Sequence, residues 1–260
     1  MSLENMESSI ALCGPSADER PLAIDLFCGL GGWTEGLIAE NWRVIGFDIE
    51  RHMYGEHRYP AQLVLQDVRT LHGRQFKDAA LIVASPPCQA YSYRAMPWRR
   101  AKALPPPDNE LFDACFRLQR EACEAAGRHI PMVVENVCGA QKWVGRAAWR
   151  YGSYYLWGDV PALMPMTKRA AFKGGDRNIG RANGAHQWNT EFNNPARNDP
   201  RDEGVKQGGE WWHDTAGLRR FSSRSPGRKA ASAMIARIPF ALARHIAASW
   251  KPQATEGPVA

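Results

Sequence analysis

The sequence predicts an α/β protein built on a doubly wound, mostly parallel sheet. Three observations predict it: short apolar runs alternate with helical patterns, each run stops at glycine or a polar residue, and the candidate functional residues lie at those stops. Ligand sites in such sheets lie at the carboxyl ends of the strands. With 260 residues, the chain is long enough to bury a domain core without disulfides.

Five short apolar runs are the expected strands, because each is rich in aliphatic or aromatic residues and is bounded by polar ones. They cover residues 22–27, 44–47, 63–65, 81–84 and 130–134. Three stretches are expected helices. Residues 33–40 follow a glycine-rich turn, residues 111–122 repeat apolar side chains at helical spacing before Gly127, and residues 239–250 begin at Pro239.

Charge and cysteine usage narrow the class of protein. The net charge is +6, and residues 165–230 hold thirteen Lys or Arg against seven Asp or Glu, which favours a nucleic-acid partner for that segment. The six cysteines include no C-x-x-C pair, so no zinc or other metal site is expected. No apolar run is long enough to span a membrane, and we expect a soluble protein of the cytoplasm.

Glycine and acidic residues at three successive strand ends suit an adenosine-bearing cofactor. Residues 28–32 supply glycines where the backbone approaches a ligand, although their spacing departs from the G-x-G-x-x-G pattern of dinucleotide binders. Asp48 follows the second strand, where a carboxylate can accept both hydroxyls of a ribose. Asp67 follows the third strand and is placed for an adenine amino group. Either carboxylate alone is equally consistent with a solvated loop residue.

Cys88 is the candidate nucleophile. It follows two prolines at a strand end, whereas Cys115 and Cys123 fit the buried face of a helix. A thiol is mostly protonated at neutral pH and needs help to act. Four basic residues follow with no acid before Asp108, and they suit a thiolate, a phosphate backbone or both: Arg94, Arg99, Arg100 and Lys102.

Glu135 is the candidate acid. It ends the fifth expected strand, and the ends of the fourth and fifth strands can face one cleft. A thiolate and a carboxyl on opposite sides of one small ring form a nucleophile–acid pair.

Three motifs resemble, in order and spacing, those of the cytosine-C5 DNA methyltransferases, in their short, phage-type form. They are residues 25–32, Ser-Pro-Pro-Cys-Gln at residues 85–89, and Glu-Asn-Val at residues 135–137. The resemblance implies a Rossmann-like class I methyltransferase that uses S-adenosyl-L-methionine. It implies that Cys88 adds to C6 of a cytosine flipped out of double-stranded DNA, that Glu135 engages the base, and that Asn136 and Pro87 hold the site's shape.

The resemblance also implies the ligand contacts and the division of the chain. No obligatory protein partner is implied, and residues 91–104 would form a lid. The expected cofactor contacts are Phe27, Gly29, Leu30, Gly31, Gly32, Asp48, Ile49, Asp67, Val68 and Pro87. The expected DNA contacts are Gln89, Arg94, Arg99, Arg100, Lys102, Trp188, Arg219 and Arg220. The expected regions are a flexible arm (1–20), a catalytic domain (21–164), a small loop-rich target-recognition segment (165–225), a returning C-terminal helix (226–250) and a flexible tail (251–260).

Departures from the family pattern leave alternatives open. The family's arginine-rich strand motif after Glu-Asn-Val is absent, with Arg146 and Arg150 as substitutes between which the sequence does not choose. Residues 235–239 replace a Gly-Asn pair. An RNA (tRNA) cytosine-5 methyltransferase and a catalytically degenerate DNA-binding homologue are the alternatives. A nicotinamide enzyme on the same fold is disfavoured by the glycine spacing.

Overall fold

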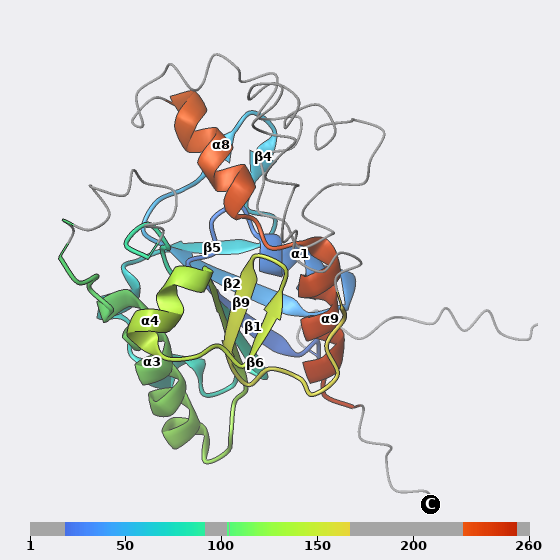
Figure 1. The fold of residues 1–260 in the computed structure, drawn as a ribbon. Coiled ribbons are helices and arrows are strands. Elements are labelled where there is room, and N and C mark those ends of the chain that lie inside the picture. The colour runs from blue at the N-terminus through green and yellow to red at the C-terminus, as the bar shows by residue number, and fades with distance from the viewer. Residues whose placement is uncertain (1–18, 92–102, 104, 167–225, 254–260) are drawn as a thin grey trace, which may run out of the picture.

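A seven-stranded sheet in the order β5-β2-β1-β6-β7-β9-β8 forms the centre of the protein (Figure 1). This computed structural model describes residues 19–91, 103, 105–166 and 226–253. The strands are β1 (Leu22–Leu26), β2 (Arg43–Asp48), β5 (Gln62–Leu65), β6 (Leu81–Ala84), β7 (Met132–Asn136), β8 (Trp149–Tyr151) and β9 (Tyr154–Gly158). All neighbours are parallel except that β9 runs antiparallel to β7 and β8. The predicted Rossmann-like, mostly parallel sheet is confirmed.

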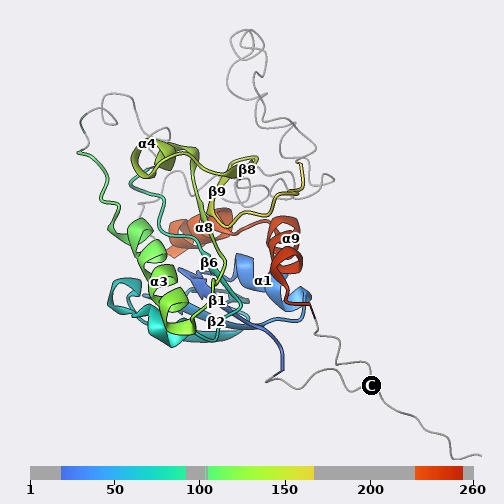
Figure 2. The same cartoon turned by 90° about the horizontal axis from the view of Figure 1, so that it is seen from below.

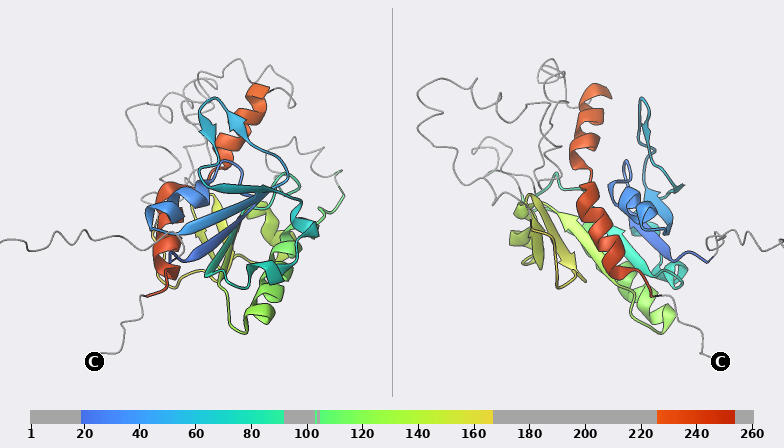
Figure 3. Two further views of the ribbon diagram at one scale, coloured as in Figure 1. Left: turned by 180° about the vertical axis from the view of Figure 1, so that it is seen from behind. Right: turned by 90° about the vertical axis from the view of Figure 1, so that its right-hand side faces the viewer.

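Helices cover both faces of the sheet. Helices α1 (Gly32–Ala39) and α9 (Phe240–Trp250) lie side by side on one face, and α3 (Glu110–Ala126) lies on the other (Figures 1 and 3). The 3₁₀ turns η1 (Val68–Thr70) and η2 (Gly73–Phe76) pack against α3. Two buried clusters result. One contains Ile82 and Leu118 on the α3 side, and the other contains Trp33 and Leu242 on the α1–α9 side.

The remaining described elements lie around the sheet's carboxyl edge and at its β8 end (Figure 2). They are the hairpin β3 (Met53–Tyr54) and β4 (His57–Arg58), the 3₁₀ turn η4 (Cys138–Ala140), and the helices α4 (Gln141–Val144) and α8 (Pro226–Ala236). None of the helices in the described ranges has the length and apolar character needed to cross a bilayer.

The five expected strands and three expected helices are confirmed with small shifts of their ends. Every residue of β6 is buried, as a central parallel strand requires. Gly127 ends α3 in the left-handed conformation, with φ 65°. The expectation that the fifth strand covers residues 130–134 is wrong at its end, because β9 pairs with Glu135 and Asn136 and so extends β7 past its apolar part.

Two hairpins were not expected from the sequence. The β8–β9 hairpin turns at Gly152, with φ 58°, and adds two strands to the sheet beyond β7. The connection from β2 to β5 holds the β3–β4 hairpin instead of a helix, and only 3₁₀ turns lead from β5 to β6. No α-helix therefore lies between β2 and β6, where none was expected from the sequence.

Helices α1 and α9 pack closely because glycines of α1 face the C-terminal segment. A Cβ on Gly36 would lie 2.4 Å from the backbone nitrogen of Arg244, and one on Gly32 would lie 2.4 Å from that of Ile238. The indole nitrogen of Trp42 donates to the carbonyl of Ala247 at 3.2 Å. Residues near the end of the chain thus complete the layer that begins directly after β1.

Replacing Gly36 by Ala should lower the free energy of unfolding by about 1–3 kcal/mol, because the new methyl group must push the α9 backbone away. This loss outweighs the roughly 1 kcal/mol that alanine gains over glycine in helix propensity. Urea unfolding measures the difference. Ala39→Gly, at an exposed position of the same helix, is the control and should show the propensity cost alone. Unchanged or increased stability of Gly36→Ala would contradict the packing described.

Candidate active site

The turn between β1 and α1 has an unusual backbone. Phe27, Gly29 and Gly31 all have positive φ, of 58°, 51° and 82°. A positive φ is costly for a bulky residue such as Phe27, and strain of this kind clusters at functional sites. A Cβ on Gly29 would meet nothing within 4 Å, whereas one on Gly31 would lie 2.5 Å from Pro60. Gly29 therefore borders open space that a ligand can enter.

Asp48 closes this turn from the end of β2. Its Oδ2 accepts from the backbone N–H of Gly29 at 2.9 Å, and its Oδ1 accepts from that of Glu50 at 3.2 Å. His52 Nε2 lies 3.5 Å from Oδ1. Burial alone would raise the pKa of Asp48, but the hydrogen bonds from His52, Gly29 and Glu50 lower it below its usual value. The carboxylate is thus ionised and held at the mouth of the turn.

Exposed apolar side chains lie next to Asp48. Ile49 is 70% exposed and Leu65, whose Cα is paired with that of Asp48 across β2 and β5, is 51% exposed. Leu30 and Val68, by contrast, are buried, and Gly32 faces the backbone of Ile238. An ionised carboxylate beside apolar surface and an open glycine fits a ribose with its attached base.

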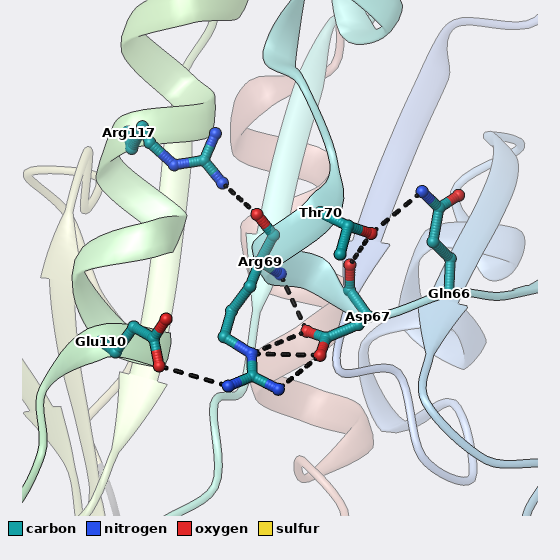
Figure 4. Close-up of polar contacts among 6 residues, drawn as sticks. All are labelled: Gln66, Asp67, Arg69, Thr70, Glu110 and Arg117. Carbon is teal, nitrogen blue, oxygen red and sulfur yellow. Dashed lines mark hydrogen bonds and ion pairs between the residues drawn. The ribbon is translucent and has the colours of Figure 1, made fainter.

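Asp67 is already engaged by a neighbour (Figure 4). Its carboxylate accepts from the backbone N–H of Arg69 at 2.9 Å and from the guanidinium at 2.5–3.1 Å. The hydrogen bond with Arg69 lowers the pKa of Asp67. Arg69 also contacts Glu110 at 3.3 Å. An adenine amino group could reach this carboxylate only if Arg69 gave up part of its contact.

Replacing Asp48 by Ala should weaken binding of the adenosine-bearing cofactor expected at this turn by about 1–3 kcal/mol, the cost of leaving polar partners unpaired, with S-adenosylhomocysteine as the probe. Calorimetric titration measures the dissociation constant. Glu50→Ala, an exposed carboxylate two residues further on, is the control and should change it little. An unchanged dissociation constant in Asp48→Ala would remove this residue from the site.

The turn that carries Cys88 is held at several points. Asn136 Nδ2 donates to the carbonyl of Pro86 at 3.0 Å, and the N–H of Tyr91 donates to the carbonyl of Cys88 at 3.0 Å. At the start of the turn, Trp33 Nε1 donates to Ser85 Oγ at 2.9 Å. Cys88 itself is half-buried. Pro87 and Gln89 on either side of it are exposed. The thiol therefore sits on a fixed turn at the open edge of the sheet.

Tyr91 anchors the far end of this turn. Its ring is buried, and its hydroxyl donates to Asn109 Oδ1 at 2.9 Å, directly before α3. Asn109 in turn donates to the carbonyl of Trp143 at 3.3 Å. Tyr91 at the end of the Cys88 turn and Asn109 at the start of α3 are therefore joined directly, and Asn109 links both to α4.

Glu135 and Asn136 lie on the strand next to the Cys88 turn. β6 and β7 are parallel, with Ala84 paired to Val134, so Glu135 lies one residue beyond this pair on β7, and Ser85 follows the pair directly after β6. Glu135 is only 3% exposed and Asn136 is fully buried. The structure thus brings the candidate nucleophile and the candidate acid to the carboxyl ends of adjacent strands.

Replacing Asn136 by Ala should destabilise the protein by about 1–3 kcal/mol, because the carbonyl of Pro86 and the N–H of Val137 each lose a buried partner. Thermal unfolding checks the stability, and the alkylation rate of Cys88 checks the position of the thiol. Gln141→Ala, which removes a side-chain bond in the next turn, is the control. Wild-type stability together with a wild-type alkylation rate would show that Asn136 does not hold the turn.

Several expected contacts lie outside the described residues, namely Arg94, Arg99, Arg100, Lys102, Trp188, Arg219 and Arg220. Of the two arginines proposed as substitutes for the missing motif, Arg150 lies on β8 and hydrogen-bonds Tyr155, while Arg146 is exposed just before it. Burial raises the pKa of Cys115, in line with the expected inert thiol. No group of metal-ligating side chains occurs among the described residues.

A buried polar network beneath the turn has no counterpart among the sequence-based expectations. Asp25 is 1% exposed, and its Oδ2 accepts from Thr34 Oγ1 at 2.6 Å. The same Thr34 oxygen lies 2.7 Å from the hydroxyl of Tyr59. Burial raises the pKa of Asp25 to about 7. The sequence shows only the aspartate before the glycine turn, and nothing in it indicates that Tyr59 reaches this group.

Part of the chain is similar to a known protein family. Residues 22–121 match the family described as C-5 cytosine-specific DNA methylase. No curated protein matches the chain.

Solved structures of three methyltransferases are similar to part of this chain. A candidate DNA modification methyltransferase encoded within an E. coli prophage is 24% identical, over 48% of this chain and 34% of its own, with a TM-score of 0.34. The S. pombe Dnmt2 methyltransferase is 18% identical, over 48% of this chain and 36% of its own, with a TM-score of 0.32. The Entamoeba histolytica methyltransferase EhMeth is 15% identical, over 58% of this chain and 57% of its own, with a TM-score of 0.36. The aligned region spans less than two thirds of each of these proteins.

Proposed function

We propose that this chain methylates carbon 5 of cytosine in DNA, because its residues 22–121 match the C-5 cytosine-specific DNA methylase family. The methyl donor is S-adenosyl-L-methionine, and the place of action is the bacterial cytoplasm or nucleoid, where DNA lies. The observation that carries the proposal is the Cys88 turn beside Glu135, at the carboxyl ends of the paired strands β6 and β7.

The residues of the β1–α1 turn suit this cofactor. Gly29 borders open space, Asp48 offers an ionised carboxylate to a ribose, and Ile49 offers an exposed apolar surface to an adenine. When bound, S-adenosyl-L-methionine supplies an electrophilic methyl group. Asp67 joins this set only after its contact with Arg69 is loosened.

Cys88 and Glu135 would act on the cytosine ring from two sides. Cytosine is weakly nucleophilic at C5 until C6 becomes tetrahedral, so Cys88 adds its sulfur to C6. Glu135 holds a proton at N3 and accepts from the exocyclic amine, which offsets charge as electrons shift toward C5. After methylation, loss of the C5 proton lets the C6–sulfur bond break and frees Cys88. The base must leave the duplex stack, because the thiol cannot reach C6 within it.

Bisulfite sequencing tests the proposal in cells that express the chain or its Cys88→Ala form. Methylated cytosines resist conversion, so protected cytosines in one short motif, present only with Cys88, are the expected result. The same treatment of tRNA from those cells separates the RNA alternative from DNA. If neither nucleic acid gains protected cytosines while the purified chain binds S-adenosylhomocysteine, the chain is a binding homologue without activity.

A further inference from the structure

A basic and aromatic surface lies beside the candidate active site, on α4, the following loop and β8. No Asp or Glu occurs between Glu135 and Asp159, while Lys142, Arg146 and Arg150 add three positive charges. All three basic side chains are exposed, and Trp149 is 39% exposed among them. No carboxylate in the described part of the chain pairs with any of the three. We call these four residues the α4–β8 surface.

The strand register places this surface level with the candidate acid. Arg150 is paired with Tyr155 across β8 and β9, and Tyr155 is paired with Asn136 across β9 and β7. Trp149 is likewise level with Leu156 and Glu135. Neighbouring strands are about 4.8 Å apart, so Arg150 lies roughly 10 Å from Asn136 along the sheet. That separation suits a phosphate close to a base that Glu135 engages.

Hydrogen bonds fix the backbone of the surface in advance. Trp157 Nε1 donates to the carbonyl of Gly145 at 3.0 Å, and the N–H of Ala148 donates to Leu156 at 2.8 Å. The N–H of Ala147 donates to Gln141 Oε1 at 3.2 Å. The ammonium of Lys142 lies 4.3 Å from the centre of the Trp143 ring. A rigid platform loses little entropy when its charges meet a partner.

We propose that the α4–β8 surface binds the phosphate backbone of the nucleic-acid substrate next to the target base. Cations that pair with no carboxylate of the described residues, together with an exposed indole, suit an extended polyanion that carries aromatic bases. The inference rests on the proposed function for the identity of the substrate, and it adds binding residues to those expected in the lid and the recognition segment.

Salt-dependent binding of the full chain to a fluorescein-labelled cytosine-containing DNA duplex tests the proposal. In the triple variant Lys142→Gln, Arg146→Gln, Arg150→Gln, affinity at low salt should fall roughly tenfold or more. The slope of log K against log salt should fall by about 0.9 for each phosphate that the variant no longer neutralises. The control triple variant removes the same charge near the amino ends of the strands and on the outer side of α3, at exposed Arg74, Lys77 and Arg120.

The outcomes separate this inference from the proposed function. A fall in affinity and slope in the α4–β8 variant alone supports the surface, even if the wild type methylates nothing. Equal behaviour of the α4–β8 variant and wild type, or an equal fall in both triple variants, overturns it. A parallel series with a tRNA transcript shows which nucleic acid depends on the surface, and binding of S-adenosylhomocysteine verifies that both variants fold.

Discussion

Replacing Cys88 by Ser is expected to reduce methyl transfer by about 10⁴-fold or more, because a hydroxyl is a far weaker nucleophile than a thiolate and no other group replaces it. The dissociation constant for S-adenosylhomocysteine should stay within roughly twofold of wild type, since most of the proposed cofactor contacts lie at the ends of β1 and β2, away from the thiol. Single-turnover transfer of a labelled methyl group to duplex DNA measures the first quantity, and calorimetry measures the second.

Covalent capture sharpens this test. A duplex with 5-fluorocytosine at the target carries fluorine where a proton must leave, so the bond between sulfur and C6 should persist after methyl transfer. Mass spectrometry should find one adduct per chain on the peptide containing Cys88, and none in Cys88→Ser. Cys123→Ala is the matched control, because that thiol lies on α3 and accepts from the N–H of Ile130, near the amino end of β7. An adduct on another cysteine, or turnover by Cys88→Ser, would refute the assigned mechanism.

Replacing Glu135 by Gln is expected to lower kcat by about 10²–10⁴-fold, the usual contribution of a positioned acid. Glutamine fills the same space and can still accept at its oxygen, but it cannot supply a proton to N3. The loss should appear in kcat at saturating cofactor, while cofactor affinity stays close to wild type. Steady-state kinetics with labelled cofactor separate the two quantities.

Two comparisons guard against a trivial explanation for Glu135→Gln. Thermal unfolding should show a folded protein, because the change preserves volume at a position that is 3% exposed. Glu124→Gln, at an exposed position of α3, should leave kcat unchanged. Full activity in Glu135→Gln would mean that this carboxyl does not touch the base, even though it lies beside the Cys88 turn.

The strand ends could be predicted from the sequence because a parallel sheet leaves a strong local pattern. Apolar runs such as residues 81–84 must be buried on both faces, and the residues that follow them, Cys88 among them, then have to gather at one edge. The order and spacing of the motifs also predicted that Cys88 and Glu135 act on the same base. These features depend on residues close together in sequence.

The remaining features depend on contacts between distant segments. The bond from Trp33 to Ser85 spans 52 residues, and the contact of Thr34 with Tyr59 spans 25. The positive φ of Phe27 has no signature in side-chain type, because phenylalanine rarely adopts it. The engagement of Asp67 by Arg69 is local, yet a carboxylate two residues before an arginine pairs with it only in some backbone conformations.

The packing of α9 on α1 has a consequence for biosynthesis. The hydrogen bond from Trp42 to Ala247 joins residues 205 positions apart, so α1 lacks its packing partner α9 until the chain has been synthesised past residue 247. At about 5–20 residues per second, that interval is roughly 10–40 s. During it, Trp33 and Leu37, both buried in the finished protein, face water beside an incomplete layer. The nascent chain is therefore expected to be a client of chaperones that bind exposed apolar surface until α9 emerges.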